Sequence, residues 1–176
     1  MNKTIVVAVV LALAVGIFAW LAARRGPTPL PQPEENLVSR SIGIVAEGAV
    51  LHYQENLVWA EDQFLKILGD QDGFRMAQIS RFNEFYHVSA DNFSVEFNEE
   101  GRLTILRCGV HGQLKGDWYD FHWLLNPLGL DLIDSHFIKS DKELCWSGVI
   151  EGVPTTIVLR FPFVIDHCHA HVWQKR

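Results

Sequence analysis

An uncharged apolar run near the N-terminus constrains this chain more than any other feature. Residues 5–23 read IVVAVVLALAVGIFAWLAA, with Lys3 before the run and Arg24 and Arg25 after it. As an α-helix with a rise of 1.5 Å per residue, the run would be about 28 Å long, close to the hydrocarbon thickness of a bilayer. The sequence therefore predicts a transmembrane anchor over residues 1–25.

Two other interpretations of the run stay open. A cleaved signal peptide has a similar basic start, but its apolar region is usually only about 7–15 residues long. A buried core helix would rarely lack polar residues over five turns. Basic residues flank both ends, so the charge rule does not decide the orientation, whereas the short N-terminal tail favours a signal-anchor. We expect a single-pass protein of the cell membrane with an extracytoplasmic domain.

A proline-rich segment separates this anchor from the rest of the chain. Residues 26–33 read GPTPLPQP, and four prolines in eight residues exclude a helix. Such segments favour extended polyproline geometry and act as semi-rigid spacers. We therefore divide the chain into the anchor, a linker over residues 26–35 and a soluble domain over residues 36–176.

Composition limits what this domain can be. Hydrophobic residues make up 48% of the chain and charged residues 20%, which excludes a wholly disordered protein. The formal net charge is −6, and no dense run of lysine or arginine appears. Because nucleic-acid binding requires a basic surface, we expect no nucleic-acid partner.

The first half of the domain has a mostly helical pattern. Apolar residues recur at spacings of three or four, namely Val38, Ile42, Val45, Ala49, Tyr53, Leu57, Ala60, Phe64 and Leu68. This spacing predicts helices over residues 37–49 and 50–68, the second of which ends at Gly69. A strand over residues 42–53 is the alternative.

Beyond Gly73 the pattern changes to alternation, which is typical of strands. Two hairpins are predicted, residues 93–97 with 102–110 and residues 143–150 with 153–163, and further strand-like runs cover residues 118–125 and 164–173. Short turns cannot make parallel crossovers. We therefore expect an α+β fold with one or two helices packed on a curved, mainly antiparallel sheet of about six strands.

A histidine-rich stretch near the C-terminus is the strongest candidate site. Residues 166–173 read DHCHAHVW, and in a single strand the three histidines would share one face. Imidazole and thiolate are the usual ligands of zinc and copper. The predicted ligands of such a metal are His167, His169, His171, Cys168, Cys108 and His111. The spacing matches no standard four-ligand template, and half-buried histidines bonded to carbonyl groups or water would need no metal.

The remaining features favour binding over catalysis. No GxSxG, HExxH or CxxC motif is present, so enzymatic activity has little support in the sequence. Tryptophan is enriched at interfaces, and the residues predicted to contact a partner are Trp118, Trp123, Trp146 and Trp173. Our leading hypothesis is an accessory subunit of a membrane complex that binds a membrane protein. A zinc or copper domain and a lipid or small-ligand module are the alternatives.

Overall fold

The structure is a computed structural model, and it describes residues 36–132, 135–168 and 171–174. These residues belong to a compact unit that spans residues 34–176. The predicted anchor and linker lie outside the described residues. Within the described part of the chain, no helix is long and apolar enough to cross a membrane.

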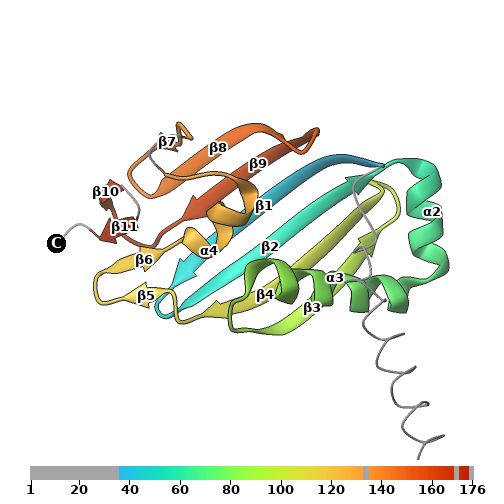
Figure 1. Ribbon diagram of the computed structural model, residues 1–176, viewed down its shortest axis with the longest axis horizontal. Helices are drawn as coiled ribbons and strands as arrows, with labels where there is room; N and C mark the ends of the chain where they lie inside the picture. Colours follow the sequence, from blue (N-terminus) through green and yellow to red (C-terminus); the bar gives the residue numbers. More distant parts are fainter. Residues whose placement is uncertain (1–35, 133–134, 169–170, 175–176) are drawn as a thin grey trace, which may run out of the picture. The chain divides into compact units, whose positions relative to one another are not determined.

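A seven-stranded sheet forms the centre of the described domain (Figure 1). In spatial order its strands are β3 (Ala90–Asn98), β4 (Leu103–His111), β2 (Val50–Trp59), β1 (Leu37–Glu47), β9 (Val153–Arg160), β8 (Glu143–Ile150) and β7 (Ile138–Lys139). Neighbouring strands are antiparallel except β1 and β9, which are parallel. The pairing of β1 with β9 joins the first strand of the domain to one of its last.

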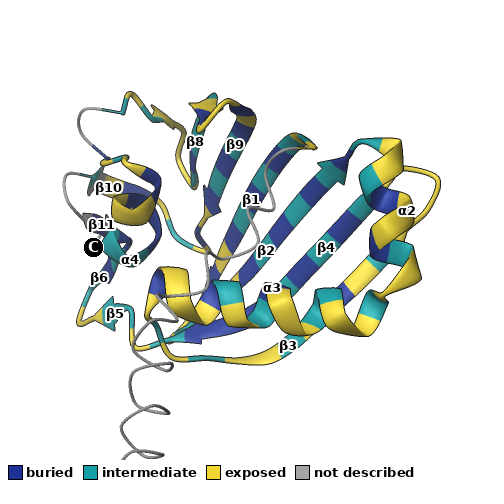
Figure 2. Cartoon of the chain, turned by 45° about the vertical axis from the view of Figure 1, so that its right-hand side comes forward, coloured by how far each residue is buried: buried dark blue, intermediate teal, exposed yellow. Residues whose placement is uncertain are grey.

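A second, smaller sheet and four helical segments complete the domain. The small sheet has the order β10 (Ile165–Cys168), β11 (His171–Gln174), β6 (Trp118–Asp120) and β5 (Leu114–Lys115). The helical segments are α2 (Glu61–Gly69), α3 (Gln71–Tyr86), α4 (His122–Leu125) and the 3-10 turn η1 (Asn126–Leu128). Both α3 and α4 lie on the same side of the seven-stranded sheet, which we name its inner face (Figures 1 and 2). The opposite side is the outer face.

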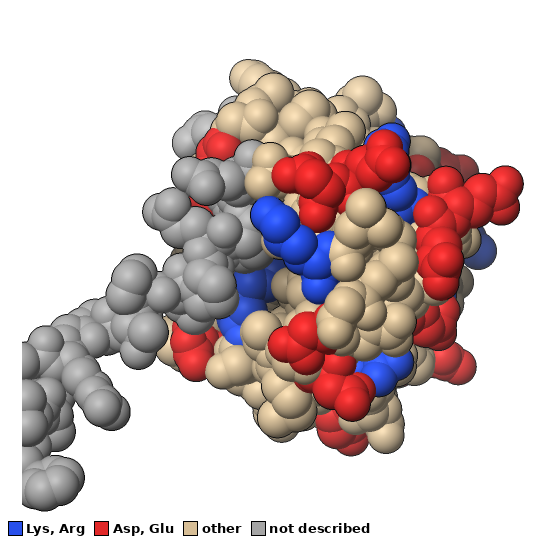
Figure 3. Space-filling model, turned by 90° about the vertical axis from the view of Figure 1, so that its right-hand side faces the viewer, with Lys and Arg blue, Asp and Glu red and all other residues tan. Residues whose placement is uncertain are grey.

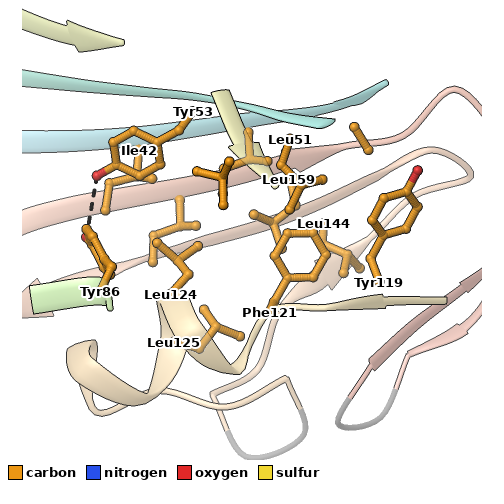
Figure 4. Close-up of a cluster of buried hydrophobic side chains, with 14 of the residues drawn as sticks. Ile42, Leu51, Tyr53, Tyr86, Tyr119, Phe121, Leu124, Leu125, Leu144 and Leu159 are labelled. Atoms are coloured by element: carbon orange, nitrogen blue, oxygen red, sulfur yellow. Dashed lines mark hydrogen bonds between the residues drawn. The ribbon is translucent and has the colours of Figure 1, made fainter. Parts of the chain in front are cut away.

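The core lies between the inner face and these helices. Burial alternates along each central strand, so that Ile42 and Ile44 of β1 and Leu51 and Tyr53 of β2 are buried while their neighbours are more exposed (Figure 2). Figure 4 shows Ile42, Leu51 and Tyr53 on the sheet facing Phe121 and the α4 residues Leu124 and Leu125. Alternation with one buried face is the pattern expected of an antiparallel sheet whose other face meets water.

The predicted α+β class and mainly antiparallel sheet are confirmed. Both predicted hairpins are present, as β3–β4 and β8–β9. The predicted number of strands is too small, because the described residues contain a seven-stranded and a four-stranded sheet. The parallel exception is β1 with β9, two strands that are far apart in the sequence and therefore need no short crossover.

Several local predictions are wrong. Residues 37–49 form β1 rather than a helix, and residues 50–68 divide into β2 and most of α2. The helix α3 was not predicted, because the pattern beyond Gly73 was interpreted as the alternation of strands. Residues 118–125 change from strand to helix after Asp120, and residues 164–173 contain the two strands β10 and β11 rather than one.

Candidate functional site

The outer face of the large sheet carries an open groove of about 720 Å³. It runs across five strands, from Asp91 on β3 to Arg160 on β9. We name it the outer groove. The helices α3 and α4 lie on the opposite side of the sheet, so neither of them covers it (Figure 1).

Two glycines border the outer groove, and one of them opens it. Gly109 of β4 lies in register between His52 and Asp91, and Gly43 of β1 lies between Gln54 and Val158. A residue without a side chain can leave a gap in its row of the sheet. At Gly109 neighbouring side chains fill that space, since a Cβ there would lie 3.0 Å from Asp91 Oδ1. A Cβ atom built at Gly43 would come no closer than 4.0 Å to another group, the carbonyl oxygen of Gln54. The groove above Gly43 is therefore open.

Polar side chains form a continuous hydrogen-bonded row along the groove. The Nδ2 of Asn56 donates to Ser41 Oγ at 3.0 Å, and the Nε2 of Gln54 donates to Asn56 Oδ1 at 3.0 Å. Arg107 Nε donates to Gln54 Oε1 at 2.9 Å. Arg107 also binds the carboxylate of Glu96. These five residues, which we name the outer ladder, hold one another in fixed orientations.

The basic side chains along the groove each lie beside a carboxylate. His111 Nε2 is 2.9 Å from Asp91 Oδ1, and Arg160 Nε is 2.8 Å from Glu143 Oε2. His52 pairs with Glu47 in the same way at 3.0 Å. Each basic side chain of the groove thus has a carboxylate partner. The amide and hydroxyl groups of the groove are suited to hydrogen bonding with a neutral polar surface rather than to capturing an anion.

The inner face contains a different polar group, a buried ion cluster of Arg40, Glu55 and Arg81. The side chain of Glu55 is only 1% exposed, and Arg40 Nε lies 3.5 Å from its Oε1. Arg81 reaches down from α3 and binds the other carboxylate oxygen. The cluster lies towards the end of the sheet from which α2 leaves. Seen from that end, the surface has a hollow in which basic side chains gather, with acidic side chains around it (Figure 3).

Two tyrosines extend this cluster into the core. The hydroxyl groups of Tyr53 and Tyr86 are 3.4 Å apart, as the dashed line in Figure 4 shows. Burial, with a further contribution from Glu55, raises the pKa of both phenols above the ordinary value. Burial, the largest single contribution, lowers the pKa of Arg81, but Glu55 together with Tyr53 and Tyr86 outweighs it, and the pKa is raised. The phenols therefore stay neutral and Arg81 stays charged, which suits a structural role.

The structure separates the predicted metal ligands. Cys108 borders the outer groove but is only 5% exposed and packs in the core, whereas His111, on the same strand, pairs with Asp91 in the groove. Burial raises the pKa of the Cys108 thiol to about 12, so the thiolate that a metal needs is disfavoured. The structure does not bring these two residues together.

The histidine-rich stretch contains two antiparallel strands, so the interpretation of one strand with three histidines on one face is wrong. His167 belongs to β10 and His171 to β11, and Cys168 pairs with Val172. His169 lies outside the described residues, and only the backbone of His167 and His171 is described. The residues that the structure describes contain no group of three or more metal-ligating side chains. The metal site stays a prediction.

The predicted contact residues mostly lie near the core. Trp123 on α4 packs edge-to-face against Tyr86, with ring centroids 5.5 Å apart, and Trp146 on β8 lies over Gly148. Trp118 on β6 pairs in register with Trp173 on β11, of which only the backbone is described. Among the described residues, Trp123 and Trp146 thus contribute to packing on the core, and no contact with a partner is needed to explain their positions.

Sequence reasoning missed the residues that make the outer groove. Gly43 fell inside the helix predicted over residues 37–49, and Gln54 and Arg107 had no assigned role. The available signal was glycine inside an alternating pattern, which indicates a gap or a close approach in a sheet. That signal was readable at Gly109 but hidden at Gly43 by the helical spacing around it.

Comparison with known proteins assigns no family to this chain. No family model matches it, and no curated protein or solved structure matches it at a significant level. Function is therefore inferred from the chain's own residues.

Proposed function

We propose that this chain is a single-pass membrane-anchored binding protein that acts as an accessory subunit of a membrane complex. The apolar run of residues 5–23 supplies the anchor, the proline-rich residues 26–35 are the spacer, and the domain binds a protein partner at the outer groove. The observation that carries the proposal is the outer ladder, a row of fixed amide, hydroxyl and guanidinium groups on a sheet face that α3 and α4 leave open.

The chemistry of the groove favours a protein surface as the partner. Gln54 and Asn56 present amide groups, which match the peptide groups and polar side chains of a protein. Val45 and Val158 add apolar contact beside them. Because the ladder is held by its own hydrogen bonds, little side-chain entropy is lost when a partner binds. A groove with paired charges also avoids the cost of burying a lone ion.

A photo-crosslinking experiment in the producing cell tests this site. A photoreactive amino acid replaces Val158 in the groove or Ala77 on the exposed side of α3, within the full chain. We expect a discrete adduct of higher mass from position 158 and none from position 77. The absence of an adduct at position 158 would contradict the proposed docking site.

A groove-filling variant gives this test a matched control. Gly43→Leu projects a side chain into the open space above β1, since a Cβ there meets nothing within 4 Å except the Gln54 carbonyl at 4.0 Å. It should abolish the adduct and leave the fold intact. Gly69→Leu makes the same change at the end of α2, where the space around the Cβ is also open, and should leave the adduct unchanged. An adduct that survives Gly43→Leu would argue against the groove.

The anchor is tested separately. The full chain should stay with membranes after extraction at alkaline pH and enter solution only with detergent. N-terminal analysis of the purified protein should find residues 5–23 still present. A mature protein that begins after Ala23 would exclude the tether and leave the binding domain as a free protein.

Metal binding is the second candidate function. The register places His171 opposite Asp120, and Asp120 already binds His122 with a separation of 2.8 Å between Oδ1 and Nδ1. A carboxylate and an imidazole are thus near one of the predicted ligands. After loading with zinc or copper, protein without an affinity tag should hold one metal ion per chain. The double variant His167→Ala/His171→Ala should hold none, and equal loading of both would exclude this function.

A lipid or small-ligand module is the third alternative. Such modules enclose most of their ligand in an apolar cavity. The outer groove is instead open and lined by many polar groups, so it gives this alternative no support. It therefore ranks below the other two.

A further inference from the structure

One edge of the large sheet is only partly paired within the described part of the chain. The short strand β7 pairs with β8 through Ile138 with Cys145 and Lys139 with Leu144. Just before it, His136 has a φ of 55°, a left-handed conformation that turns the chain away. Residues 146–150 of β8 consequently have β9 on one side and no strand on the other among the described residues. We name them the β8 edge, which is the upper border of the sheet in Figure 1.

The opposite edge of the same sheet is protected, and the β8 edge is not. The edge strand β3 has a bulge between Asp91 and Ser94, a left-handed Asn92 and the charge of Glu96. Bulges and charges are the usual devices that stop edge strands from pairing with other chains. The sequence LCWSGVI over residues 144–150 contains neither charge nor proline, and its register with β9 is regular. Val149 on this edge is 67% exposed.

The hairpin geometry fixes which peptide groups face outwards. The turn between β8 and β9 has two residues, Glu151 and Gly152, with φ angles of 51° and 83°, as in a type I′ turn. Such a turn is closed by a hydrogen-bonded pair, here Ile150 and Val153, and hydrogen-bonded pairs alternate along an antiparallel ladder. The peptide groups of Ile150, Gly148 and Trp146 therefore face β9. Those of Ser147 and Val149 face the open edge.

We propose that the β8 edge pairs in antiparallel fashion with the β8 edge of a second copy of this chain, about a two-fold axis at Gly148. In this register Ser147 and the partner's Val149 exchange hydrogen bonds, and the symmetric pair does the same. A register centred on Ser147 would require Cys145, which is already paired with Ile138 of β7. Of these two registers, the chain's own topology therefore favours the one centred on Gly148.

The side chains of the β8 edge are complementary to themselves in this register. Gly148 meets the partner's Gly148 in a pair without hydrogen bonds, where Cα atoms approach to about 4.5 Å and a missing side chain avoids crowding. On the inner face Trp146 meets the partner's Ile150, and on the outer face Ser147 meets the partner's Val149. No like charges are opposed, as an isologous interface requires. The outer groove lies on other strands, and the dimer leaves it free.

The mass of the full chain in mild detergent, measured by size exclusion with light scattering, tests the proposal. The wild-type particle should contain two chains. In the variant Ser147→Lys/Val149→Lys, a lysine at 147 faces a lysine at the partner's position 149, and the symmetric pair does the same. This repulsion should raise the dissociation constant roughly tenfold or more and leave one chain per particle. A wild-type particle of one chain, or a double-lysine variant that still contains two, would overturn the proposal.

A charge-swapped variant tests the register itself. Ser147→Glu/Val149→Lys changes the same two exposed positions, but the glutamate of each copy then faces the introduced lysine of the other copy, so the two-chain particle should return. Both variants lose the contact between Ser147 and Thr156 equally, and circular dichroism should show both to be folded. If the chains associated through the apolar N-terminal run instead, wild type and both variants would have the same number of chains per particle. Failure of the charge swap to restore the dimer would exclude this register.

Discussion

The two faces of β2 hold neighbouring polar residues in opposite ways. Glu55 points to the inner face, is almost completely buried, and depends on Arg40 and Arg81 for compensation of its charge. Gln54, the residue before it, points to the outer face and bonds to Arg107 and Asn56 at the edge of water. Both residues belong to networks that cross several strands. The difference teaches that burial, not the number of polar contacts, decides how much such a network contributes to stability.

The largest expected effect comes from removing the charge inside. Glu55→Gln keeps the size of the side chain but leaves two guanidinium groups without an anion in a buried place. Removing one partner of a buried ion pair typically costs about 3–5 kcal/mol of unfolding free energy. Urea unfolding followed by tryptophan fluorescence measures the loss. A cost below about 1 kcal/mol would show that the inner cluster is solvated and would remove the contrast between the faces.

A neutral hydrogen bond on the inner face gives the next largest effect. The indole Nε1 of Trp59 donates to Thr104 Oγ1 at 2.9 Å, and both residues are buried. Thr104→Val has nearly the same shape but leaves the indole N–H unpaired, at a cost of about 1–3 kcal/mol. Thr156→Val on the outer face is the matched control and should change the unfolding free energy by less than about 0.5 kcal/mol. Equal losses from the two variants would contradict the comparison.

The buried thiol of Cys108 on the inner face should make the free energy of unfolding depend on pH. The fold raises the pKa of Cys108 from 9.0 to about 12, chiefly by burial and further through Glu55 and Asp91. The neutral thiol is therefore favoured in the folded state. The unfolded chain ionises this thiol above about pH 9, whereas the folded chain does so only near pH 12. The free energy of unfolding is therefore unaffected by the thiol below about pH 9 and falls as the pH rises towards 12. Between pH 8 and pH 10, the free energy of unfolding should fall by about 1 kcal/mol more in wild type than in Cys108→Ala.

A second buried substitution controls for the cavity that Cys108→Ala creates. Val110→Ala also removes a side-chain group from the inner face of β4 but no ionisable one. Its unfolding free energy should run parallel to that of wild type between pH 8 and pH 10. Parallel curves for Cys108→Ala as well would mean that water reaches the thiol.

The smallest effect is expected on the outer face. Glu96→Gln removes the carboxylate that pairs with Arg107, but both side chains are more than a third exposed. Exposed ion pairs contribute about 0–1 kcal/mol, and salt screens them. The difference from wild type should shrink further in 1 M salt. A loss comparable to that of Glu55→Gln would mean that the outer ladder is a structural element and not a surface prepared for binding.

The same comparison explains where sequence reasoning failed. Hairpins β3–β4 and β8–β9 were predictable because their alternation is local and turn residues separate the strands. In β1 and β2, by contrast, Arg40 and Glu55 occupy inner positions and interrupt the apolar alternation. The remaining apolar residues then fit a helical spacing by coincidence. The charges of Arg40 and Glu55 belong to the cluster that binds α3 to the sheet, and they also made β1 and β2 hard to predict as strands.

Helix α3 was missed for a related reason. Its inner side contains Gln78 and Arg81 among aromatic residues, so its apolar stripe is interrupted. The parallel pairing of β1 with β9 could not be predicted, because the local sequence pattern of neither strand indicates which distant strand it pairs with. The outer groove depends on that pairing, since Val158 and Arg160 reach it only from β9.

The late pairing of β1 has a consequence for biosynthesis. Ile42 of β1 pairs with Ile157 of β9. Most of the domain must therefore leave the ribosome before β1 can pair with its second neighbouring strand. Until that moment β1 is an open template of alternating apolar residues, which is the kind of intermediate that aggregates or engages chaperones. Chains that terminate before β9 should therefore accumulate as insoluble material and not as a smaller working domain.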